Sequence, residues 1–263
     1  MQLFTIFGNP VSHSRSPLMH NYVFKKRGID ACYTRTQLSD GSKLRDVFFA
    51  KGLSGANVTV PHKEAAFGAC DEIRGIAKEI GAVNTLINEN GRLIGYNTDA
   101  DGFIATIQSF GTLKNALILG AGGTARALAT VLRRHTIEPV ILNRSSGRLD
   151  YFSENGYQAY SWETFTPDAY DLIINTTSAG LSDDLLPLSA PLLTQLLSRS
   201  RCAIDVIYGK ETPFLHEVKR AELPFKDGSD MLLEQGVLAN HLFMHGTVST
   251  DTIRPIMQQS FLY

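Results

Sequence analysis

A short apolar run, a glycine-rich turn and a helical pattern follow one another in residues 115–132 (NALILGAGGTARALATVL), and this succession constrains the fold more than any other feature. Residues 116–119 are all apolar, as expected for a strand that is covered on both faces of a parallel sheet. Gly120, Gly122 and Ala125 then occupy the small-residue positions of the pattern G-x-G-x-x-G/A. They permit a tight turn, close approach of the backbone to phosphate groups and close packing of helix on strand. The sequence therefore predicts a Rossmann-like domain that holds a dinucleotide pyrophosphate at a helix N-terminus.

The end of the next predicted strand indicates which dinucleotide is held. This strand covers residues 139–142, and Asn143, Arg144 and Ser145 follow it. An NAD site usually has Asp or Glu here, which accepts hydrogen bonds from the ribose 2'-hydroxyl group. Arg144 and Arg148 can instead donate to a 2'-phosphate, and Ser145 adds a neutral donor. The sequence favours NADP over NAD; the alternative is that NRSSGR is a solvated loop whose arginines contact nothing.

Length and composition are those of a globular protein with about two domains. The chain has 263 residues, of which 43% are hydrophobic and 19% are charged, and its formal net charge is -1. This charge gives no reason to expect nucleic acid or an acidic membrane as a partner. No apolar run is long enough to span a bilayer, and the first ten residues lack the features of a signal peptide. The widely spaced Cys32, Cys70 and Cys202 suggest buried thiols in a reducing cytoplasm.

Before residue 115, short β-type runs alternate with helical patterns, which predicts a separate α/β domain. Ser16 is typical of a helix N-cap, and the helix that follows is expected to turn Leu18 inward and to stop at Gly28. Pro61 is expected in the first turn of a later helix, and Asn90 with Gly91 predicts a hairpin. The predicted strands are residues 3–7, 32–38, 55–60, 83–88 and 92–96, and the predicted helices include residues 42–50 and 98–110.

The second half continues the alternation of strands and helices, so a mostly parallel sheet covered on both faces is expected. Two apolar helical patterns, at about residues 230–245 and 250–260, are expected to return to the first domain. We therefore predict an α/β fold with two domains and a cleft between them. The N-terminal α/β substrate-binding (catalytic) domain is discontinuous, with residues 1–102 plus 236–263, and the Rossmann-like NADP-binding domain covers residues 103–235.

Candidates for chemistry lie where strands of the first domain meet helices. A dinucleotide domain implies hydride transfer, so the other domain is expected to hold a substrate and a proton-transfer group. Lys63 is predicted in the first turn of a helix, whose positive end disfavours the charged form of lysine. Asp99, at the start of a different helix, would favour that form if the two side chains met. Such a pair could bind a substrate hydroxyl and pass the proton that accompanies hydride transfer; alternatively, both are ordinary surface residues.

Hydroxyl and amide side chains near the same junctions are further candidates. Ser14 and Ser16 lie two residues apart in an extended stretch before a proline, so their hydroxyl groups can both point toward a carboxylate. Thr59, Asn84 and Asn97 suit a ligand rich in alcohol groups, although each could instead close a turn.

His241 and His245 are four residues apart on one face of a predicted helix, a spacing that can bind zinc. No Glu follows His241, so the general base of an HExxH site is missing. Helix packing is the preferred explanation, and we predict no metal site.

Several sequence motifs occur in a characteristic order along nearly the whole chain. They are GNPVSHSRSPLMHN from Gly8, NVTVPHK from Asn57, GAVNT from Gly81, GYNTDADG from Gly95, GAGGTAR from Gly120, NRS from Asn143, NTTSAG from Asn175, DVIY from Asp205 and GSDMLLEQG from Gly228. In these motifs the chain resembles the shikimate dehydrogenase family. The resemblance implies NADPH-dependent reversible reduction of 3-dehydroshikimate to shikimate, in the shikimate pathway of chorismate and aromatic amino-acid biosynthesis.

The resemblance also implies roles for individual residues, with Lys63 and Asp99 as the catalytic pair and the two serines holding the substrate carboxylate. The residues implied to bind substrate are Ser14, Ser16, Thr59, Lys63, Asn84, Asp99, Tyr208 and Gln235. Those implied to bind NADP are Gly120, Ala121, Gly122, Gly123, Thr124, Ala125, Asn143, Arg144, Ser145, Arg148, Thr176, Ile207 and Gly228.

Two positions depart from the family pattern. Leu181 replaces a common Met and can alter contact with the nicotinamide, and Gly236 replaces a common Ala and is expected to loosen its helix by roughly 0.5–1 kcal/mol.

Three alternative functions are considered. The first is a quinate- or shikimate-oxidising enzyme of the same family, for which NAD is an alternative cofactor. The others are a non-catalytic dinucleotide sensor and an unrelated enzyme such as a folate dehydrogenase. The expected location is the cytoplasm, the expected partner is the small-molecule substrate, and a homodimer is the oligomer considered.

Overall fold

The computed structural model describes residues 1–263, which divide into two compact units. Unit 1 consists of Met1–Gly102 and Leu232–Tyr263, and unit 2 consists of Phe103–Met231. The chain re-enters unit 1 at Leu232, inside the continuous helix α10 (Gly228–Phe243), whereas the sequence placed this return at residue 236. No helix has both the length and the apolar character that crossing a membrane requires.

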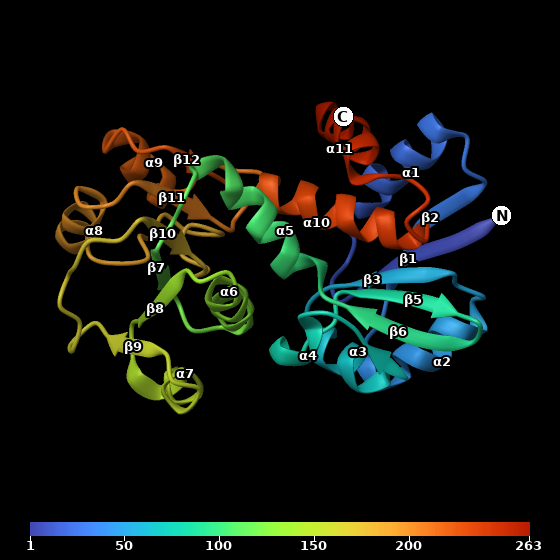
Figure 1. The fold of residues 1–263 in the computed structure, drawn as a ribbon, viewed down its shortest axis with the longest axis horizontal. Coiled ribbons are helices and arrows are strands. Elements are labelled where there is room, and N and C mark those ends of the chain that lie inside the picture. The colour runs from blue at the N-terminus through green and yellow to red at the C-terminus, as the bar shows by residue number, and fades with distance from the viewer. The chain divides into compact units, whose positions relative to one another are not determined.

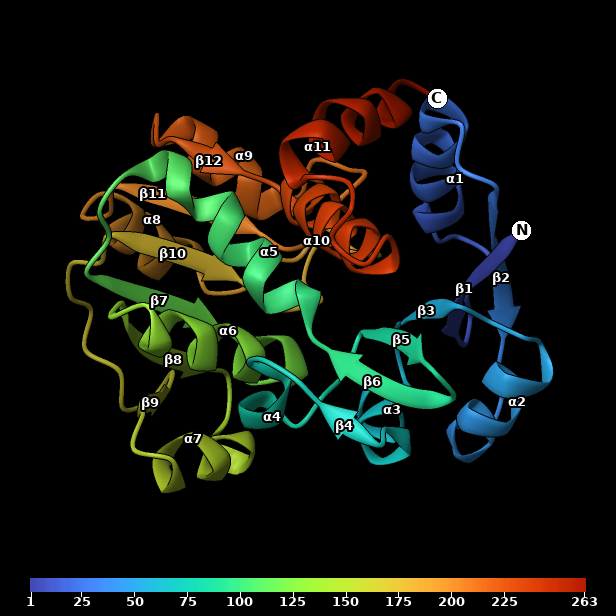
Figure 2. The same ribbon diagram turned by 45° about the vertical axis from the view of Figure 1, so that its right-hand side comes forward.

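Unit 1 is built on a six-stranded mixed sheet in the order β2-β1-β3-β5-β6-β4 (Figure 1; β4 is labelled in Figure 2). β1 pairs in parallel with β2 and β3, and β5 and β6 form an antiparallel hairpin. Asn90 and Gly91 both have positive φ at the tip of this hairpin, which confirms the predicted turn. The strands are β1 (Gln2–Gly8), β2 (Ala31–Gln37), β3 (Gly55–Val58), β4 (Glu72–Ile73), β5 (Thr85–Glu89) and β6 (Arg92–Tyr96).

Helices of unit 1 bury two separate apolar clusters against this sheet. Phe7 and Val58 pack with Phe48 and Ala66, whereas Phe4 and its neighbours pack with residues of α1 and α10. Because side chains alternate along a strand, Phe4 and Phe7 on β1 serve opposite clusters. The helices, besides α10, are α1 (Ser16–Arg27), α2 (Leu44–Ala50), α3 (Lys63–Ala69), α4 (Ala77–Ile80), the start of α5 (Thr98–Ile107) and α11 (Thr250–Gln259).

Unit 2 contains a wholly parallel six-stranded sheet in the order β12-β11-β10-β7-β8-β9. Its strands are β7 (Asn115–Leu119), β8 (Glu138–Asn143), β9 (Gln158–Ser161), β10 (Leu172–Asn175), β11 (Cys202–Asp205) and β12 (Phe225–Lys226). Its helices are α6 (Gly123–Arg134), α7 (Asp150–Glu154), α8 (Ala190–Leu197) and α9 (Pro213–Arg220). This arrangement confirms the predicted α/β class and parallel sheet.

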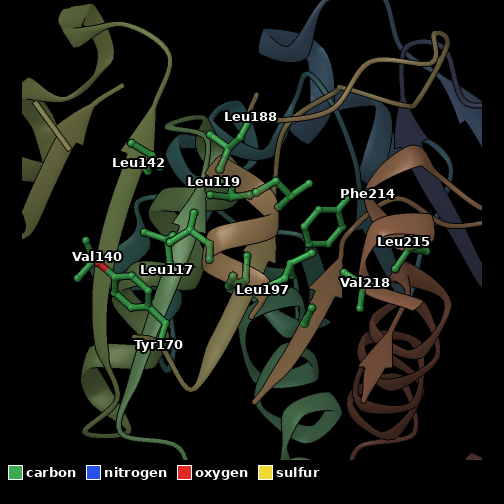
Figure 3. Close-up of a cluster of buried hydrophobic side chains, with 14 residues drawn as sticks. Leu117, Leu119, Val140, Leu142, Tyr170, Leu188, Leu197, Phe214, Leu215 and Val218 are labelled. Atoms are coloured by element: carbon green, nitrogen blue, oxygen red, sulfur yellow. The ribbon is translucent and has the colours of Figure 1, made fainter. Parts of the chain in front are cut away.

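The two faces of the unit 2 sheet are covered by different helices (Figure 2). On one face Leu117 and Leu119 of β7 pack with Leu197 of α8 and Phe214 of α9, as the close-up shows (Figure 3). On the other face lies α6 (Figure 2). Burial on both faces explains why the strands are continuously apolar.

Several local predictions are wrong in detail. Ser16 is the first helical residue of α1 and not its N-cap, and Leu18 is exposed, because the helix turns Met19 and Val23 toward the core instead. Pro61 lies in the turn before α3, which begins at Lys63. His245 lies beyond the end of α10, so His241 and His245 do not share a helix face.

The three cysteines are free thiols, of which Cys202 is buried and Cys32 and Cys70 are half-buried. Burial raises the pKa values of Cys70 and Cys202 to about 12, so both thiols stay protonated at neutral pH.

Candidate active site

Lys63 and Asp99 meet in unit 1. The Lys63 Nζ atom lies 2.7 Å from Oδ2 of Asp99, and the two side chains are 34% and 21% exposed. Lys63 is the first residue of α3, and Asp99 is the second residue of α5. A carboxylate is favourable at this position, because the N-terminus of a helix is the positive end of its dipole. An ammonium and a carboxylate thus face each other at a partly open position, where a ligand hydroxyl or carbonyl group can reach them.

Strand register explains why residues so far apart in the sequence come together. Phe7 of β1 pairs with Val58 of β3, so the chain segments that follow these strands leave the same edge of the sheet. Thr85 of β5 pairs with both Asn57 of β3 and Tyr96 of β6. The segments leading to Lys63 and to Asp99 therefore lie on adjacent parts of one sheet.

Ser14 and Ser16 lie together as predicted, but not in an extended stretch, because Arg15 has α-type backbone angles and Ser16 begins α1. Their hydroxyl oxygens are 3.3 Å apart, and the Ser14 hydroxyl accepts the amide hydrogen of Ser16 over 3.3 Å. Both side chains are buried. The guanidinium group of Arg35 donates to the carbonyl oxygen of Ser14 from Nη2 at 2.6 Å and from Nε at 3.2 Å. Arg35 thus holds this segment from β2, a contact that the sequence did not reveal.

Asn84 belongs to a buried network of polar side chains. Its Oδ1 atom accepts the amide hydrogen of Thr98 over 2.7 Å and the hydroxyl hydrogen of Thr85 over 3.0 Å, and its Nδ2 atom donates to the Thr98 hydroxyl over 3.1 Å. Asn57 extends the network, because its Nδ2 atom donates to the Thr85 hydroxyl over 3.0 Å. Thr98 precedes Asp99, so this network reaches the start of α5.

The network continues from Asn57 to Tyr33 and His20, two residues that the sequence did not indicate as part of the site. The Tyr33 hydroxyl donates to Oδ1 of Asn57, and the ring of His20 stacks on Tyr33 with centroids 4.5 Å apart. Burial lowers the pKa of His20 to about 3, so the imidazole is neutral at pH 7. Its Nδ1 atom is 3.0 Å from Nδ2 of Asn240. A tyrosine in an alternating strand looks like an ordinary core residue, so only the structure reveals these contacts.

Other residues expected to bind substrate are not brought into hydrogen-bond contact with the Lys63–Asp99 pair. Thr59 is half-buried, and its amide donates to the carbonyl of Phe7 over 2.8 Å. Gln235 is buried, and its Nε2 atom donates to the carbonyl of Leu232 in its own helix over 2.8 Å. Tyr208 belongs to unit 2 and is exposed.

Asn97 uses both ends of its amide on the backbone. Its Oδ1 atom accepts the amide hydrogen of Ala100 over 3.2 Å, and its Nδ2 atom donates to the carbonyl of Ala82 over 3.1 Å. Of the two predicted alternatives, the structure therefore shows Asn97 closing a turn. The same junction borders a small cavity of about 150 Å³, lined among others by Tyr96, Asn97 and Thr98.

In unit 2, the candidate dinucleotide residues gather at the carboxyl edge of the parallel sheet. Leu119 of β7 pairs with Leu142 of β8 and with Asn175 of β10, and Asn175 pairs with Asp205 of β11. The loops after these four strands therefore start at one edge, which is where α/β folds bind ligands. They carry the cofactor candidates Gly120–Ala125, Asn143–Arg148, Thr176 and Ile207.

The glycine-rich turn has a positive φ at Gly120 and borders open space at the start of α6. Gly120 has a φ of +106°, and a Cβ atom there would lie 2.8 Å from Oγ1 of Thr176. At Gly122 and Gly123 a Cβ atom would meet no protein atom within 4 Å, so these residues border open space. No side chain caps the N-terminus of α6, which leaves its first amides available to an anion. Ala125 is fully buried, as expected for close packing of helix on strand.

The basic strand end is also accessible. Arg144, Ser145 and Arg148 are exposed, and the two guanidinium groups form no salt bridge or hydrogen bond within the protein. Asn143 donates from Nδ2 to the carbonyl of Ser145 over 2.9 Å, which shapes this loop. These residues fit a 2'-phosphate group, which needs charged donors that are not already paired.

The remaining candidates are held by close backbone contacts. Thr176 donates its hydroxyl hydrogen to the carbonyl of Leu119 over 2.7 Å. Gly228 donates its amide hydrogen to the carbonyl of Ile207 over 3.0 Å, and a Cβ atom at Gly228 would collide with the carbonyl of Val206. Glycine at 228 is therefore required by packing, whatever ligand lies nearby.

Comparisons with known proteins agree on one family. Residues 6–86 match the model of the shikimate dehydrogenase substrate binding domain. A shikimate dehydrogenase (NADP(+)) of Helicobacter hepaticus is 47% identical over 242 residues, which cover 91% of this chain and 90% of the relative. A protein of the same name from Helicobacter pylori strain P12 is 43% identical, with 99% of both chains covered.

Solved structures agree as well. The shikimate dehydrogenase of Aquifex aeolicus superposes with a TM-score of 0.89 at 31% identity, with 99% of this chain and 97% of that chain covered. The shikimate 5-dehydrogenase of Thermus thermophilus, solved in complex with NADP(H) and shikimate, gives a TM-score of 0.85 at 34% identity, with 99% and 100% covered. The chain belongs to the shikimate dehydrogenase family.

Proposed function

We propose that this protein catalyses the NADPH-dependent reversible reduction of 3-dehydroshikimate to shikimate, in the shikimate pathway of chorismate and aromatic amino-acid biosynthesis. The observation that carries the proposal is the 2.7 Å contact between Lys63 and Asp99, in a chain of this family. In this proposal unit 1 binds the substrate, which the match of residues 6–86 to a substrate binding domain supports, and unit 2 binds NADP.

The chemistry requires a hydride and a proton. When bound, NADPH supplies the hydride to the ketone carbon, and the product alcohol takes one proton at the former carbonyl oxygen. We assign the delivery of that proton to Lys63, because an ammonium group can donate to the carbonyl oxygen as negative charge develops there. Asp99 orients the ammonium and accepts a hydrogen bond from a substrate hydroxyl. In the oxidation direction the same pair receives the proton from the alcohol.

Substrate recognition is assigned to the hydroxyl and amide groups of unit 1. Ser14 and Ser16 present two neighbouring hydroxyl groups, which suit a carboxylate with two acceptor oxygens. Thr59, Asn84 and Gln235 are assigned to the ring hydroxyl groups, together with Asp99. Tyr208 is assigned a place near the substrate.

NADP is assigned to the carboxyl edge of the unit 2 sheet. The amides at the start of α6 and the open space at Gly122 and Gly123 suit the diphosphate. Arg144 and Arg148, with Ser145, suit the 2'-phosphate, which favours NADP over NAD. Cytoplasmic location and a homodimer complete the proposal.

Absorbance of reduced nicotinamide at 340 nm tests the proposal, with shikimate and quinate each assayed against NADP and NAD. The expected result is turnover of shikimate with NADP and much slower reaction in the other three combinations. Equal or faster turnover of quinate with NAD would favour the alternative of a quinate-oxidising enzyme. NADPH binding without any turnover of 3-dehydroshikimate would favour the dinucleotide sensor.

A substitution at Lys63 tests the catalytic pair. Lys63→Ala is expected to abolish most turnover and to leave NADPH binding nearly intact, because Lys63 belongs to unit 1. Lys78→Ala is the matched control, since Lys78 also belongs to a helix of unit 1 but forms no salt bridge. Unchanged turnover of Lys63→Ala would reject Lys63 as catalytic.

A further inference from the structure

The Lys63–Asp99 pair is formed by side chains from two different helices, so its geometry depends on how those helices are fixed. Neither side chain is fully buried, and the ammonium and carboxylate hold each other through their mutual hydrogen bond. The positions of these two groups are therefore set largely by the backbones of Lys63 and Asp99. A shift of about 1 Å in such a pair can cost roughly 100-fold in rate.

One short segment, residues 82–84 of the GAVNT motif, is hydrogen-bonded to both helices. The amide of Val83 donates to the carbonyl of Lys63 over 3.0 Å, which fixes the start of α3. On either side of Val83, the carbonyl of Ala82 accepts from Nδ2 of Asn97, and Oδ1 of Asn84 accepts from the amide of Thr98. The segment thus links the backbone of Lys63 to the two residues that precede Asp99.

Asn97 joins this segment to the helix itself. Its Oδ1 atom accepts the amide hydrogen of Ala100, three residues later, as an N-cap residue does. Its Nδ2 atom makes the bond to Ala82, and the side chain is buried, with 4% exposed. One amide group therefore caps the helix that carries Asp99 and ties that helix to the segment that holds Lys63.

We propose that Asn97 is a positioning residue that sets the geometry of the Lys63–Asp99 pair. This inference rests on the proposed function. It goes beyond that function because Asn97 touches neither reacting group and has no place among the assigned substrate-binding residues. A residue that only stabilised α5 would need its capping oxygen but not its bond to Ala82.

Two substitutions separate the two bonds. Asn97→Ser keeps an oxygen that caps helices well but is too short to retain the donor to Ala82, whereas Asn97→Ala removes both bonds. If Asn97 positions the pair, both variants lose kcat by roughly 10- to 100-fold, while KM for shikimate changes much less. In the reduction of 3-dehydroshikimate with 4-deuterated NADPH, the isotope effect on kcat rises in both variants, because hydride transfer becomes more rate-limiting.

Asn88, in the β5–β6 hairpin that ends just before Asn97, provides a matched control. Its Oδ1 atom accepts the amide hydrogen of Gly91, also three residues later, and its Nδ2 atom donates to the carbonyl of Leu53. These are the same two kinds of bond, made at the opposite end of β5. Asn88→Ser is expected to leave kcat and the isotope effect unchanged.

The separation between Lys63 Nζ and Asp99 Oδ2 in crystals of Asn97→Ser gives a readout that does not depend on turnover. An increase beyond about 4 Å, the limit for a salt bridge, together with the loss of kcat, supports the proposal. Wild-type kcat and an unchanged separation in Asn97→Ser would overturn it, even if the melting temperature fell. If the wild-type protein itself did not turn over shikimate with NADP, the proposed function would fail, and the crystal separation would decide the positioning role alone.

Discussion

The hydroxyl group of Tyr33 donates a 2.7 Å hydrogen bond to Oδ1 of Asn57, and both side chains are buried. This bond fixes the orientation of the Asn57 amide, whose Nδ2 atom must then face Thr85. Through Thr85 the orientation is passed to Asn84, which is assigned to a substrate hydroxyl group.

Removal of the Tyr33 hydroxyl is expected to weaken substrate binding. Tyr33→Phe leaves Oδ1 of Asn57 buried without its donor, at a cost of about 1–3 kcal/mol in the free energy of unfolding. KM for shikimate is expected to rise roughly 3- to 10-fold, as the network that orients Asn84 loosens. Steady-state kinetics and urea unfolding measure the two effects. Tyr22→Phe removes an exposed hydroxyl group bonded to Gln259 and should change neither.

Arg144→Ala is expected to reduce the preference for NADP over NAD by roughly 10- to 100-fold, because it removes a charged donor to the 2'-phosphate. The ratio of kcat/KM for the two cofactors measures this preference. Arg199→Ala, at another exposed arginine of unit 2, serves as the control. An unchanged ratio in Arg144→Ala would show that NRSSGR is a solvated loop.

The same substitution, Gly to Ala, is expected to have different effects on stability at two glycines inside helices. At Gly102 in α5 a Cβ atom would lie 2.6 Å from the backbone nitrogen of Gln235, so Gly102→Ala must push α10 away. Such overpacking costs about 1–3 kcal/mol and the helix-propensity gain offsets about 1 kcal/mol, so the expected net loss in the free energy of unfolding is up to about 2 kcal/mol. A higher KM for shikimate should accompany it if Gln235 binds substrate.

Gly236→Ala is the matched substitution in α10. Its Cβ atom would meet Cε of Met19 at 2.7 Å and Sδ of Met257 at 3.0 Å, which are the ends of flexible side chains that can move. The net change in the free energy of unfolding is therefore expected to stay within about 1 kcal/mol. A loss as large as that of Gly102→Ala would contradict this interpretation of the two contacts.

Asp205 gives a prediction about pH. Burial raises the pKa of this carboxyl, although Thr212, Ile207 and Asn175 donate hydrogen bonds to it. The folded protein therefore binds this proton more tightly than the unfolded chain, and the resulting stability is fully present below about pH 4 and is lost as pH rises through the folded pKa. Asp205→Asn lacks this dependence, so its stability relative to wild type should improve as pH rises from about 4 to 7.

Asp183 should show the opposite sign. Hydrogen bonds from the amides of Gly180 and Leu185 lower its pKa, so its contribution is present above about pH 4 and is lost as pH falls through the folded pKa. Melting temperatures of wild type, Asp205→Asn and Asp183→Asn across a pH series measure both trends. If the melting temperatures of the two variants, relative to wild type, changed with pH in the same direction, the opposite signs assigned to Asp205 and Asp183 would be wrong.

Predictions from the sequence succeeded where a backbone conformation demands particular residues. Gly120 and the pair Asn90–Gly91 have positive φ, which few other residues tolerate, so their turns could be located from the sequence. Leu18 was misplaced because α1 buries polar residues such as Ser16 and His20, which blurs its apolar stripe. β4 and β12, with two residues each, are too short to give a periodic signal.

For the site, residue types could be predicted but contacts could not. The meeting of Lys63 with Asp99 depends on the register of β3, β5 and β6, which local sequence does not specify. Arg35 was missed because its role is to bind a backbone carbonyl, which any exposed strand arginine could do.

Because unit 1 consists of two segments from opposite ends of the sequence, it can be completed only after its second segment has been synthesised. Met19 and Val23 of α1 are covered by Val237 of α10 and Met257 of α11, which are synthesised last. All of unit 2 is therefore synthesised before unit 1 is complete, and the apolar surface of the segment that carries Lys63 and Asp99 stays uncovered until α10 and α11 have been made.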